Sequence, residues 1–261
     1  MILAIIVAFM NAVDFSLILP AYNERASIAS TIEQAFGYLK SRAIDGEIIV
    51  AADGLDGTRE AVRAIAAHNP RVRVIGNEQR CGKGRAVREA MALTRGRIVG
   101  YADADNKVPI EEFDRIRPYL DGGYEVVIGS RALAKSQIER KQPLYRRAGS
   151  KGFHIFLQTV LGLPGVHDTQ CGFKFFHRNV ALRLFERQRI DGYMFDVEIL
   201  TMAHHLGFRI KEVPIRWRDD GDSRLDLLSG NLRNVIDIFK IRSYCRDPGL
   251  RAVSVAASMD D

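Results

Sequence analysis

Two aspartates separated by one small residue, Asp103 and Asp105, have the spacing most suggestive of chemistry in this sequence. They follow a short apolar segment, 97–101, whose composition indicates a buried strand. Carboxylate oxygens are the ligands that Mg²⁺ and Mn²⁺ prefer, and such an ion would bridge the two phosphates of a nucleotide diphosphate. Asp-x-Asp also occurs in ordinary surface turns, so it is the position directly after a strand that favours a metal site.

A second candidate is the string Cys81-Gly82-Lys83-Gly84, which begins a segment with helical spacing at 82–95. Its glycines would let the backbone approach a phosphate, a helix N-terminus favours anions, and Lys83 adds a positive charge. The phosphate loop of nucleoside triphosphatases, Gly-x-x-x-x-Gly-Lys-Ser/Thr, is absent. A flexible helix entry with a solvated lysine would explain the same residues without a ligand.

The turn that starts at Asp53 is a third candidate. An Asx turn and a helix N-cap would account for most of its residues, Asp53, Gly54, Asp56, Gly57 and Thr58. A carboxylate at Asp53 could also accept a hydrogen bond from a nucleobase N–H, and the turn alone does not decide between the two.

The elements that must position these residues alternate along the chain. Apolar segments indicate strands at 15–20, 47–53, 72–76, 97–101 and 125–129, and helical periodicity indicates helices at 28–39, 58–68, 82–95 and 109–120. This alternation predicts an α/β fold with a mostly parallel sheet and helices on both faces. Ligands bind such sheets at the carboxyl ends of the strands, which here precede the polar or charged segments 21–24, 53–56, 103–105 and 130–131.

The rhythm changes after residue 131, and we expect a smaller acceptor-side extension there. The sequence indicates a mobile basic loop at 132–142, helices at 146–161, 196–206 and 225–242, and strands at 173–176 and 209–217. We predict one domain over 1–246, with a nucleotide-binding half at about 15–131, an acceptor half at 132–246 and a frayed tail at 247–261.

Composition narrows the class of protein. The chain is 47% hydrophobic and 27% charged, as expected for a globular protein, and its odd set of three cysteines indicates reduced thiols in a cytosolic compartment. A net charge of +6 favours anionic partners, but the basic residues are too dispersed to predict nucleic-acid binding. The apolar start, 1–13, is shorter than the ~20 residues that span a bilayer, which favours an interfacial segment or ordered tail over an anchor.

Taken together, the motifs resemble the nucleotide-binding half of family 2 inverting glycosyltransferases with the GT-A (Rossmann-like) fold. The strings that carry this resemblance are Pro20-Ala21-Tyr22-Asn23-Glu24, the Asp53 turn, Gly82-Lys83-Gly84 and Asp103-Ala104-Asp105. The second half resembles the dolichyl-phosphate β-glucosyltransferase branch through Gly129-Ser130-Arg131, Asp168-Thr169-Gln170-Cys171-Gly172-Phe173-Lys174, Phe195-Asp196-Val197-Glu198, Glu212-Val213 and Trp217. The resemblance runs from about 15 to 242.

The resemblance implies a role for each matching residue. It implies nucleotide contacts at Pro20, Ala21, Tyr22, Glu24, Asp53, Lys83, Asp103 and Ala104, and a Mg²⁺ or Mn²⁺ ion at Asp103 and Asp105. It implies acceptor-phosphate contacts at Arg131, Arg146, Arg147 and Arg224. Two departures matter: the usual Asp-Asp-Gly-Ser turn reads Ala52-Asp53-Gly54-Leu55, and Lys107 stands where related mannosyltransferases offer a glutamine to the metal.

The implied acceptor is a polyprenyl or dolichyl phosphate, and the implied donor is UDP-glucose. A phosphate monoester is largely dianionic at neutral pH, so it can attack the anomeric carbon without a strong general base. The site must then supply alignment and cations. We expect Asp168 and Arg131 to act beside the reacting atoms, although Asp168 could instead be a turn residue. Trp217 could floor the sugar or lipid site or belong to the core, and Asp196 could N-cap its helix.

Other readings stay open at this point. A GDP-mannose-dependent transferase and a family 2 enzyme with a soluble acceptor share the same motifs. A sugar-phosphate nucleotidyltransferase would ordinarily carry a glycine-rich N-terminal loop that 19–25 is not, and a non-catalytic nucleotide-binding module is the remaining rival. For a lipid acceptor we expect peripheral contact with the cytoplasmic face of a membrane.

Overall fold

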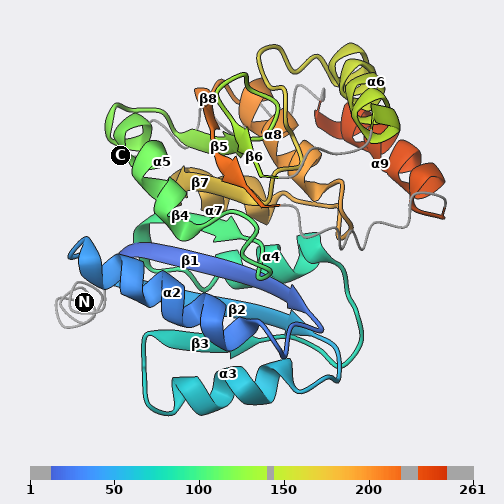
Figure 1. The fold of residues 1–261 in the computed structure, drawn as a ribbon. Coiled ribbons are helices and arrows are strands. Elements are labelled where there is room, and N and C mark those ends of the chain that lie inside the picture. Colours follow the sequence, from blue (N-terminus) through green and yellow to red (C-terminus); the bar gives the residue numbers. More distant parts are fainter. Residues whose placement is uncertain (1–12, 140–143, 219–228, 246–261) are drawn as a thin grey trace, which may run out of the picture.

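The chain is built around a single large sheet. The computed structural model describes residues 13–139, 144–218 and 229–245. Seven strands lie in the order β3-β2-β1-β4-β7-β5-β8 (Figure 1). Their bounds are β1 Val13–Tyr22, β2 Gly46–Asp53, β3 Val72–Ile75, β4 Gly96–Ala102, β5 Val126–Ser130, β7 Phe173–His177 and β8 Ile210–Pro214. The predicted α/β fold is confirmed.

One strand runs against the others. β7 is antiparallel to both of its neighbours, β4 and β5, while all other neighbouring strands are parallel. Phe173, the first residue of β7, pairs with Ala102, the last residue of β4. The segment that enters β7, 168–172, therefore lies at the carboxyl edge of the sheet, where the sequence places its ligand-binding residues.

Helices cover both faces of the sheet. They are α2 Ile28–Ser41, α3 Thr58–Ala66, α4 Lys83–Met91, η1 Ile110–Glu112, α5 Phe113–Asp121, α6 Leu144–Leu161, α7 Arg178–Glu186, α8 Phe195–His205 and α9 Ser229–Cys245. One core packs α4, α6, α7, α8 and α9 against one face, and the other packs α2, α3 and α5 against the opposite face. In α2, Ile28, Ile32 and Leu39 lie on the same side of the helix, because they are four and seven residues apart, which is close to one and two helical turns.

The second half differs from its prediction in detail. The sequence analysis missed α7, although Val180, Leu184 and Phe185 carry a helical spacing and are buried. The loop expected at 132–142 contains a short strand, β6 Gln137–Ile138, which pairs with β9 Arg216–Trp217. The strand expected at 209–217 is divided into β8 and β9. Gly207 ends α8 in a left-handed conformation, with φ of 81°, as its position predicts.

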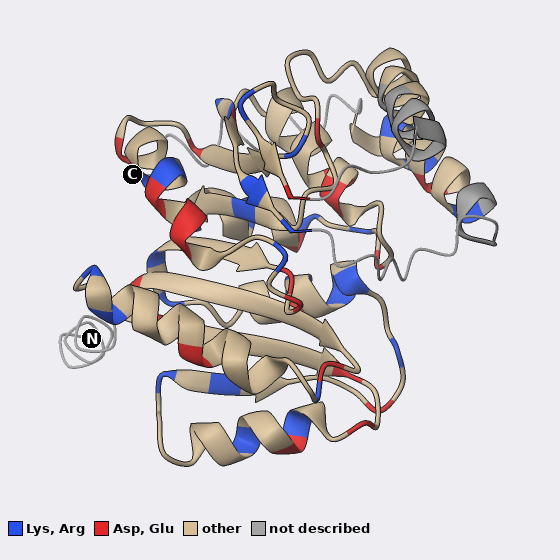
Figure 2. Cartoon of the chain, viewed as in Figure 1, with Lys and Arg blue, Asp and Glu red and all other residues tan. Residues whose placement is uncertain are grey.

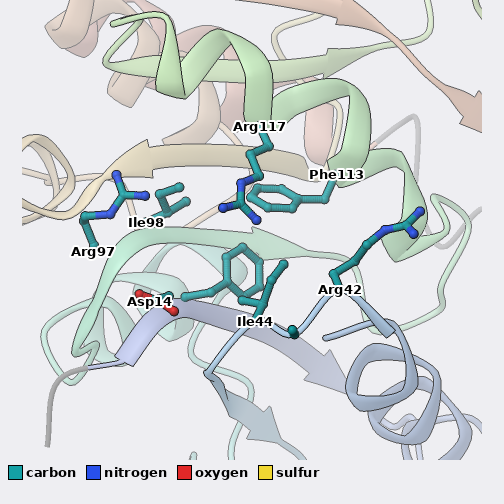
Figure 3. Close-up of a pocket in the computed structure, with 9 residues that line it drawn as sticks. Asp14, Arg42, Ile44, Arg97, Ile98, Phe113 and Arg117 are labelled. Atoms are coloured by element: carbon teal, nitrogen blue, oxygen red, sulfur yellow. The ribbon is translucent and has the colours of Figure 1, made fainter. Parts of the chain in front are cut away.

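Two further observations bear on where ligands bind. Within the ranges described above, no helix has both the length and the apolar character needed to cross a membrane. A hollow shown in Figure 3 lies at the amino edge of the sheet, beside the first residues of β1 and β4. Its arginines are already paired, Arg42 with Asp114, and Arg117 and Arg97 with Asp121 at 3.4 and 3.8 Å.

Candidate active site

The residues expected to do chemistry gather at the carboxyl edge of the sheet. Tyr22, Asp53 and Arg131 end or follow β1, β2 and β5, and Asp103 follows β4. Acidic and basic residues lie interspersed where the two halves of the chain meet (Figure 2). The sheet topology thus brings together residues that are up to 109 positions apart, 131 minus 22, in the sequence.

The two aspartates after β4 are each paired with a lysine. Lys83 Nζ lies 2.6 Å from Asp103 Oδ1, and Lys107 Nζ lies 3.3 Å from Asp105 Oδ2. Both carboxylates remain partly exposed, at 42% and 32% of their side-chain surface. Burial and the neighbouring Asp103 charge raise the pKa of Asp105, while Lys107 acts in the opposite direction.

This donor set fits a divalent cation that is shared with a ligand. Two hard oxygen donors on one turn repel each other, and an ion between them would relieve that repulsion. Within the described parts of the chain, no group of three His, Cys, Asp or Glu side chains converges on a possible metal position. An ion held by Asp103 and Asp105 would therefore take its remaining ligands from a diphosphate and water, as Mg²⁺ usually does.

The start of α4 corrects one part of the sequence interpretation. The N–H groups of Gly84 and Arg85 donate to the backbone oxygen of Asp191, at 2.8 and 3.3 Å. A Cβ at Gly82 would lie 2.3 Å from that oxygen, and a Cβ at Gly84 would lie 2.5 Å from Ile190 O. The two glycines therefore make room for the backbone of 190–191, where we expected them to make room for a phosphate. Lys83 extends from this turn toward Asp103.

Asp53 is buried and orders the loop after β3. Its Oδ1 accepts from the Asn77 N–H at 3.0 Å, and its Oδ2 accepts from the Cys81 N–H at 2.8 Å. The neighbouring Asp56 makes the expected Asx turn by accepting from the Thr58 N–H at 3.1 Å. The contact of Asp53 with a base stays a prediction.

The loop after β1 lies beside that turn. Pro20 and Ala21 belong to the end of β1, and the guanidinium of Arg80 lies 4.5 Å from the centre of the Tyr22 ring. The Glu24 N–H donates to Thr58 Oγ1 at 3.0 Å, which ties the loop to the start of α3. These contacts place Pro20, Ala21, Tyr22 and Glu24 at the same edge as Asp53, the fifth residue predicted to hold a nucleoside.

Arg131 and Asp168 form the most extensive ion pair of the site. The Arg131 side chain donates from Nε and Nη2 to the two Asp168 oxygens at 2.7 and 2.9 Å, and the Arg131 N–H adds a third bond at 2.9 Å. Burial alone would raise the pKa of Asp168, but the adjacent guanidinium holds it below its ordinary value. Since both carboxylate oxygens are engaged, the structure favours Asp168 as the residue that orients Arg131.

Trp217 completes this cluster. The Arg131 guanidinium lies 5.6 Å from the centre of its ring, within the range of a cation–π contact. The ring is only 9% exposed and packs in the core with Val213 and Ile215, so the core interpretation holds for most of its surface. A contact with sugar or lipid stays a prediction.

The string 168–174 is held by Glu212 and Asp196, for neither of which the sequence predicts this role. Glu212 accepts from the Asp168 N–H at 2.7 Å and also from the His167 N–H. The fully buried Lys174 donates to Cys171 O at 2.6 Å and to Asp196 Oδ1. Asp196 is thus not the N-cap of α8, a position that Met194 occupies.

Two further contacts link β4 and the aspartate that follows it to this string and to its partner Asp196. The hydroxyl of Tyr101 donates to Asp196 Oδ1 at 2.5 Å. A Cβ at Gly172 would lie 2.2 Å from Asp103 Oδ2, so only a glycine lets the string pass this close to the candidate metal ligand. Burying Lys174, Asp196 and Tyr101 would be costly if their polar atoms lacked hydrogen bonds, but here they bond to one another. A hydrogen-bonded network of this kind holds its members in one arrangement.

Three residues predicted to bind the acceptor phosphate remain, namely Arg146, Arg147 and Arg224. Arg146 and Arg147 belong to α6, but their side chains lie outside what the structure describes. Arg224 lies outside the described residues. Their contacts with an acceptor phosphate stay predictions.

Comparison with known proteins agrees with the site. Residues 16–185 match the family described as Glycosyl transferase family 2. A dolichyl-phosphate beta-glucosyltransferase of Trichomonas vaginalis is 34% identical over 88% of this chain and 71% of its own length. Another, of Dictyostelium discoideum, is 34% identical over 89% of this chain and 76% of its own length.

A solved structure supports the same fold. Glucosyl-3-phosphoglycerate synthase of Mycobacterium tuberculosis, in complex with Mn²⁺, UDP and phosphoglyceric acid, superposes with a TM-score of 0.66 and 25% identity. The similarity covers 93% of this chain and 82% of that one, and the same enzyme has been solved with Mg²⁺ and UDP. The sheet and its flanking helices are therefore of the GT-A type.

Proposed function

Since the chain belongs to glycosyl transferase family 2, we propose that it transfers a hexose from a nucleotide sugar, UDP-glucose in the first instance, to a polyprenyl or dolichyl phosphate with inversion at the anomeric carbon. The observation that carries this proposal is Arg131, oriented by Asp168 at the same edge of the sheet as the two aspartates that follow β4. The relatives named as dolichyl-phosphate beta-glucosyltransferases support both the sugar and the acceptor.

The donor would lie along the carboxyl ends of β1, β2 and β4. Tyr22 and Asp53 would hold the nucleoside, and Asp103 and Asp105 would hold a Mg²⁺ or Mn²⁺ ion that neutralises the departing diphosphate when it is bound. Lys83, now paired with Asp103 at 2.6 Å, is close enough to exchange that carboxylate for a phosphate oxygen. Binding of the diphosphate would therefore use cations that are already in place.

The acceptor would be aligned by Arg131. Its side chain is 32% exposed, while two hydrogen bonds from the guanidinium to Asp168 fix its direction, which suits a planar donor to a phosphate. The phosphate oxygen forms a bond to the anomeric carbon as the bond from that carbon to the diphosphate breaks. No proton has to be removed from a phosphate dianion, so this mechanism needs no general base.

A soluble phosphorylated molecule is a second candidate class of acceptor. The solved relative contains phosphoglyceric acid, a soluble anion, in a fold that matches this chain over 93% of its length. An arginine that binds the phosphate of a lipid would also bind that of a small molecule, so Arg131 does not separate the two.

The test uses the purified full chain with a panel of UDP- and GDP-sugars, Mn²⁺, and either a polyprenyl phosphate in detergent or 3-phosphoglycerate. We expect glucose transfer from UDP-glucose to the polyprenyl phosphate, and loss of transfer in Arg131→Ala with nucleotide binding retained. Transfer to 3-phosphoglycerate alone would replace the lipid acceptor by a soluble one. Equal loss of transfer and nucleotide binding in Arg131→Ala would contradict its role toward the acceptor.

A further inference from the structure

Two helices of the acceptor half carry apolar side chains on their outer surface. Ile155 of α6 is 54% exposed, and Ile236 and Phe239 of α9 are 47% and 50% exposed. The helices touch where the ring of Phe239 meets that of Phe156, with centroids 6.4 Å apart. We call Ile155, Ile236 and Phe239 the α6–α9 patch. Figure 1 shows both helices side by side, on the side of the molecule toward which the arrow of β1 points.

The patch is not the face by which α9 joins the core. Ile238, Ile241 and Cys245 supply that face and are fully or almost fully buried. At 100° per residue, Ile236 and Phe239 project to the other side of the helix. A helix that is apolar on its outer side as well as its inner side ordinarily has a partner for both.

Basic residues surround the apolar ones on α9. Arg233, Lys240 and Arg242 are exposed. The acidic Asp237 is 6% exposed and pairs with Lys240 at 3.2 Å, so it adds little negative charge to the surface. Exposed aliphatic and aromatic side chains beside arginine and lysine are typical of helices that lie in the interface of a membrane with anionic lipid.

The patch belongs to the same body as Lys83, the lysine that the proposed function assigns to the departing diphosphate. Tyr244 of α9 donates to Glu198 Oε1 at 2.5 Å, and Glu198 also accepts from the N–H groups of Arg189 and Ile190. The next residue along the chain, Asp191, accepts from the first turn of α4, which carries Lys83. A surface that binds α9 would therefore have a defined position relative to the site.

We propose that the α6–α9 patch rests on the surface of a membrane containing anionic lipid, and that the chain meets its lipid-phosphate acceptor from this side. The proposal deepens the function proposed above and rests on it for the acceptor, whereas membrane binding itself can be measured without any transfer. Apolar side chains enter the headgroup region, and Arg233 and Arg242 contact lipid phosphates.

The test compares the full chain with the double variant Ile236→Glu/Phe239→Glu in a vesicle flotation assay. The vesicles contain phosphatidylcholine and about 30% phosphatidylserine, because this anionic lipid gives the membrane a negative surface potential. Leu93→Glu is the matched control, because Leu93 is 41% exposed and lies just after α4, outside the patch. We expect about tenfold less vesicle-bound double variant, with the control unchanged. Arg233→Gln/Arg242→Gln should lose the preference for anionic over neutral vesicles.

Transfer then separates this inference from the proposed function. With polyprenyl phosphate embedded in vesicles, the double variant should lose about tenfold in rate, while it matches the unchanged chain when the acceptor is in detergent. Equal flotation of the variant and the unchanged chain would overturn the patch, even if transfer occurs. A concentration-dependent dimer that the double variant abolishes, without vesicle binding, would also overturn it and assign the patch to a second copy. Absence of transfer in detergent would instead count against the proposed function.

Discussion

The pairing of Arg131 with Asp168 makes a prediction that two single substitutions and their combination can test. In Arg131→Ala the Asp168 carboxylate, which is 8% exposed, is left without its cation. Breaking a buried pair in this way costs about 3–5 kcal/mol in the free energy of unfolding. In Asp168→Ala the guanidinium keeps 32% of its side-chain surface in water, so we expect a smaller loss of about 2–3 kcal/mol.

The double substitution removes both charges, so no buried charge is left without its partner. Its loss should therefore fall short of the sum of the single losses by about 1–3 kcal/mol, which urea unfolding of the four proteins measures. Because the folded-state pKa of Asp168 is depressed, the stabilisation is present above the unfolded pKa of about 3.9 and is lost as the pH falls through the folded value. The differences between the four proteins should shrink together in that acidic range.

Kinetics of the same four proteins test the role of Asp168. If it acts by orienting Arg131, Asp168→Ala lowers the rate of transfer in the unchanged chain but has no further effect once Arg131 is alanine. The dissociation constant of UDP with Mn²⁺, measured by calorimetry, should be the same in all four. Additive losses of stability would refute the pairing, and a further loss of rate in the Arg131→Ala background would show that Asp168 contacts the substrate itself.

Three other predictions follow from single contacts. Asp105→Ala should abolish the increase in UDP affinity that Mn²⁺ causes in calorimetry, and an unchanged titration would contradict the metal site. Gly84→Ala should lower the free energy of unfolding by about 1–3 kcal/mol in urea, because the new Cβ would lie 2.5 Å from a backbone oxygen. Its control, Gly37→Ala in the open middle of α2, should stabilise by about 0.5–1 kcal/mol, and equal effects would refute the packing argument. Cys81 should react first with a thiol reagent at pH 8, as burial raises the pKa of the other two cysteines to about 12; three equal rates would contradict this.

The sequence predicts the plan of the sheet because its signals are local. Apolar segments followed by polar turns mark the strands and their carboxyl ends, and Asp53, Asp103 and Arg131 all lie where this rule puts them. The direction of β7 has no such signal, since a short phenylalanine-rich segment such as Phe173–His177 can form a parallel or an antiparallel strand. By contrast, α7 does have a local signal, because Val180, Ala181, Leu184 and Phe185 recur at the spacing of a helix with one apolar side.

Charges were harder to predict, because their partners lie far away in the chain. An acidic residue at the start of a helix is typical of an N-cap, yet Asp196 bonds to Tyr101 and Lys174, which come from two strands. In the same way, no local pattern shows that Glu212 supports the backbone at Asp168. Such pairs depend on the fold as a whole, so a single sequence marks the residues but leaves their partners open.

The glycines of the site have a packing role, whereas long side chains are left to contact ligands. The sequence left Gly82 and Gly84 open between a phosphate loop and a flexible helix entry, and in the structure they let the backbone of 190–191 pass close by, as Gly172 passes close to Asp103. At the start of α4 the N–H groups of Gly84 and Arg85 donate to Asp191 O, so these two donors are used within the fold. We therefore expect long side chains that extend from the packed backbone to recognise the diphosphate and the phosphate. Lys83 and Arg131 both have that form, and each is held in place by an aspartate at its tip.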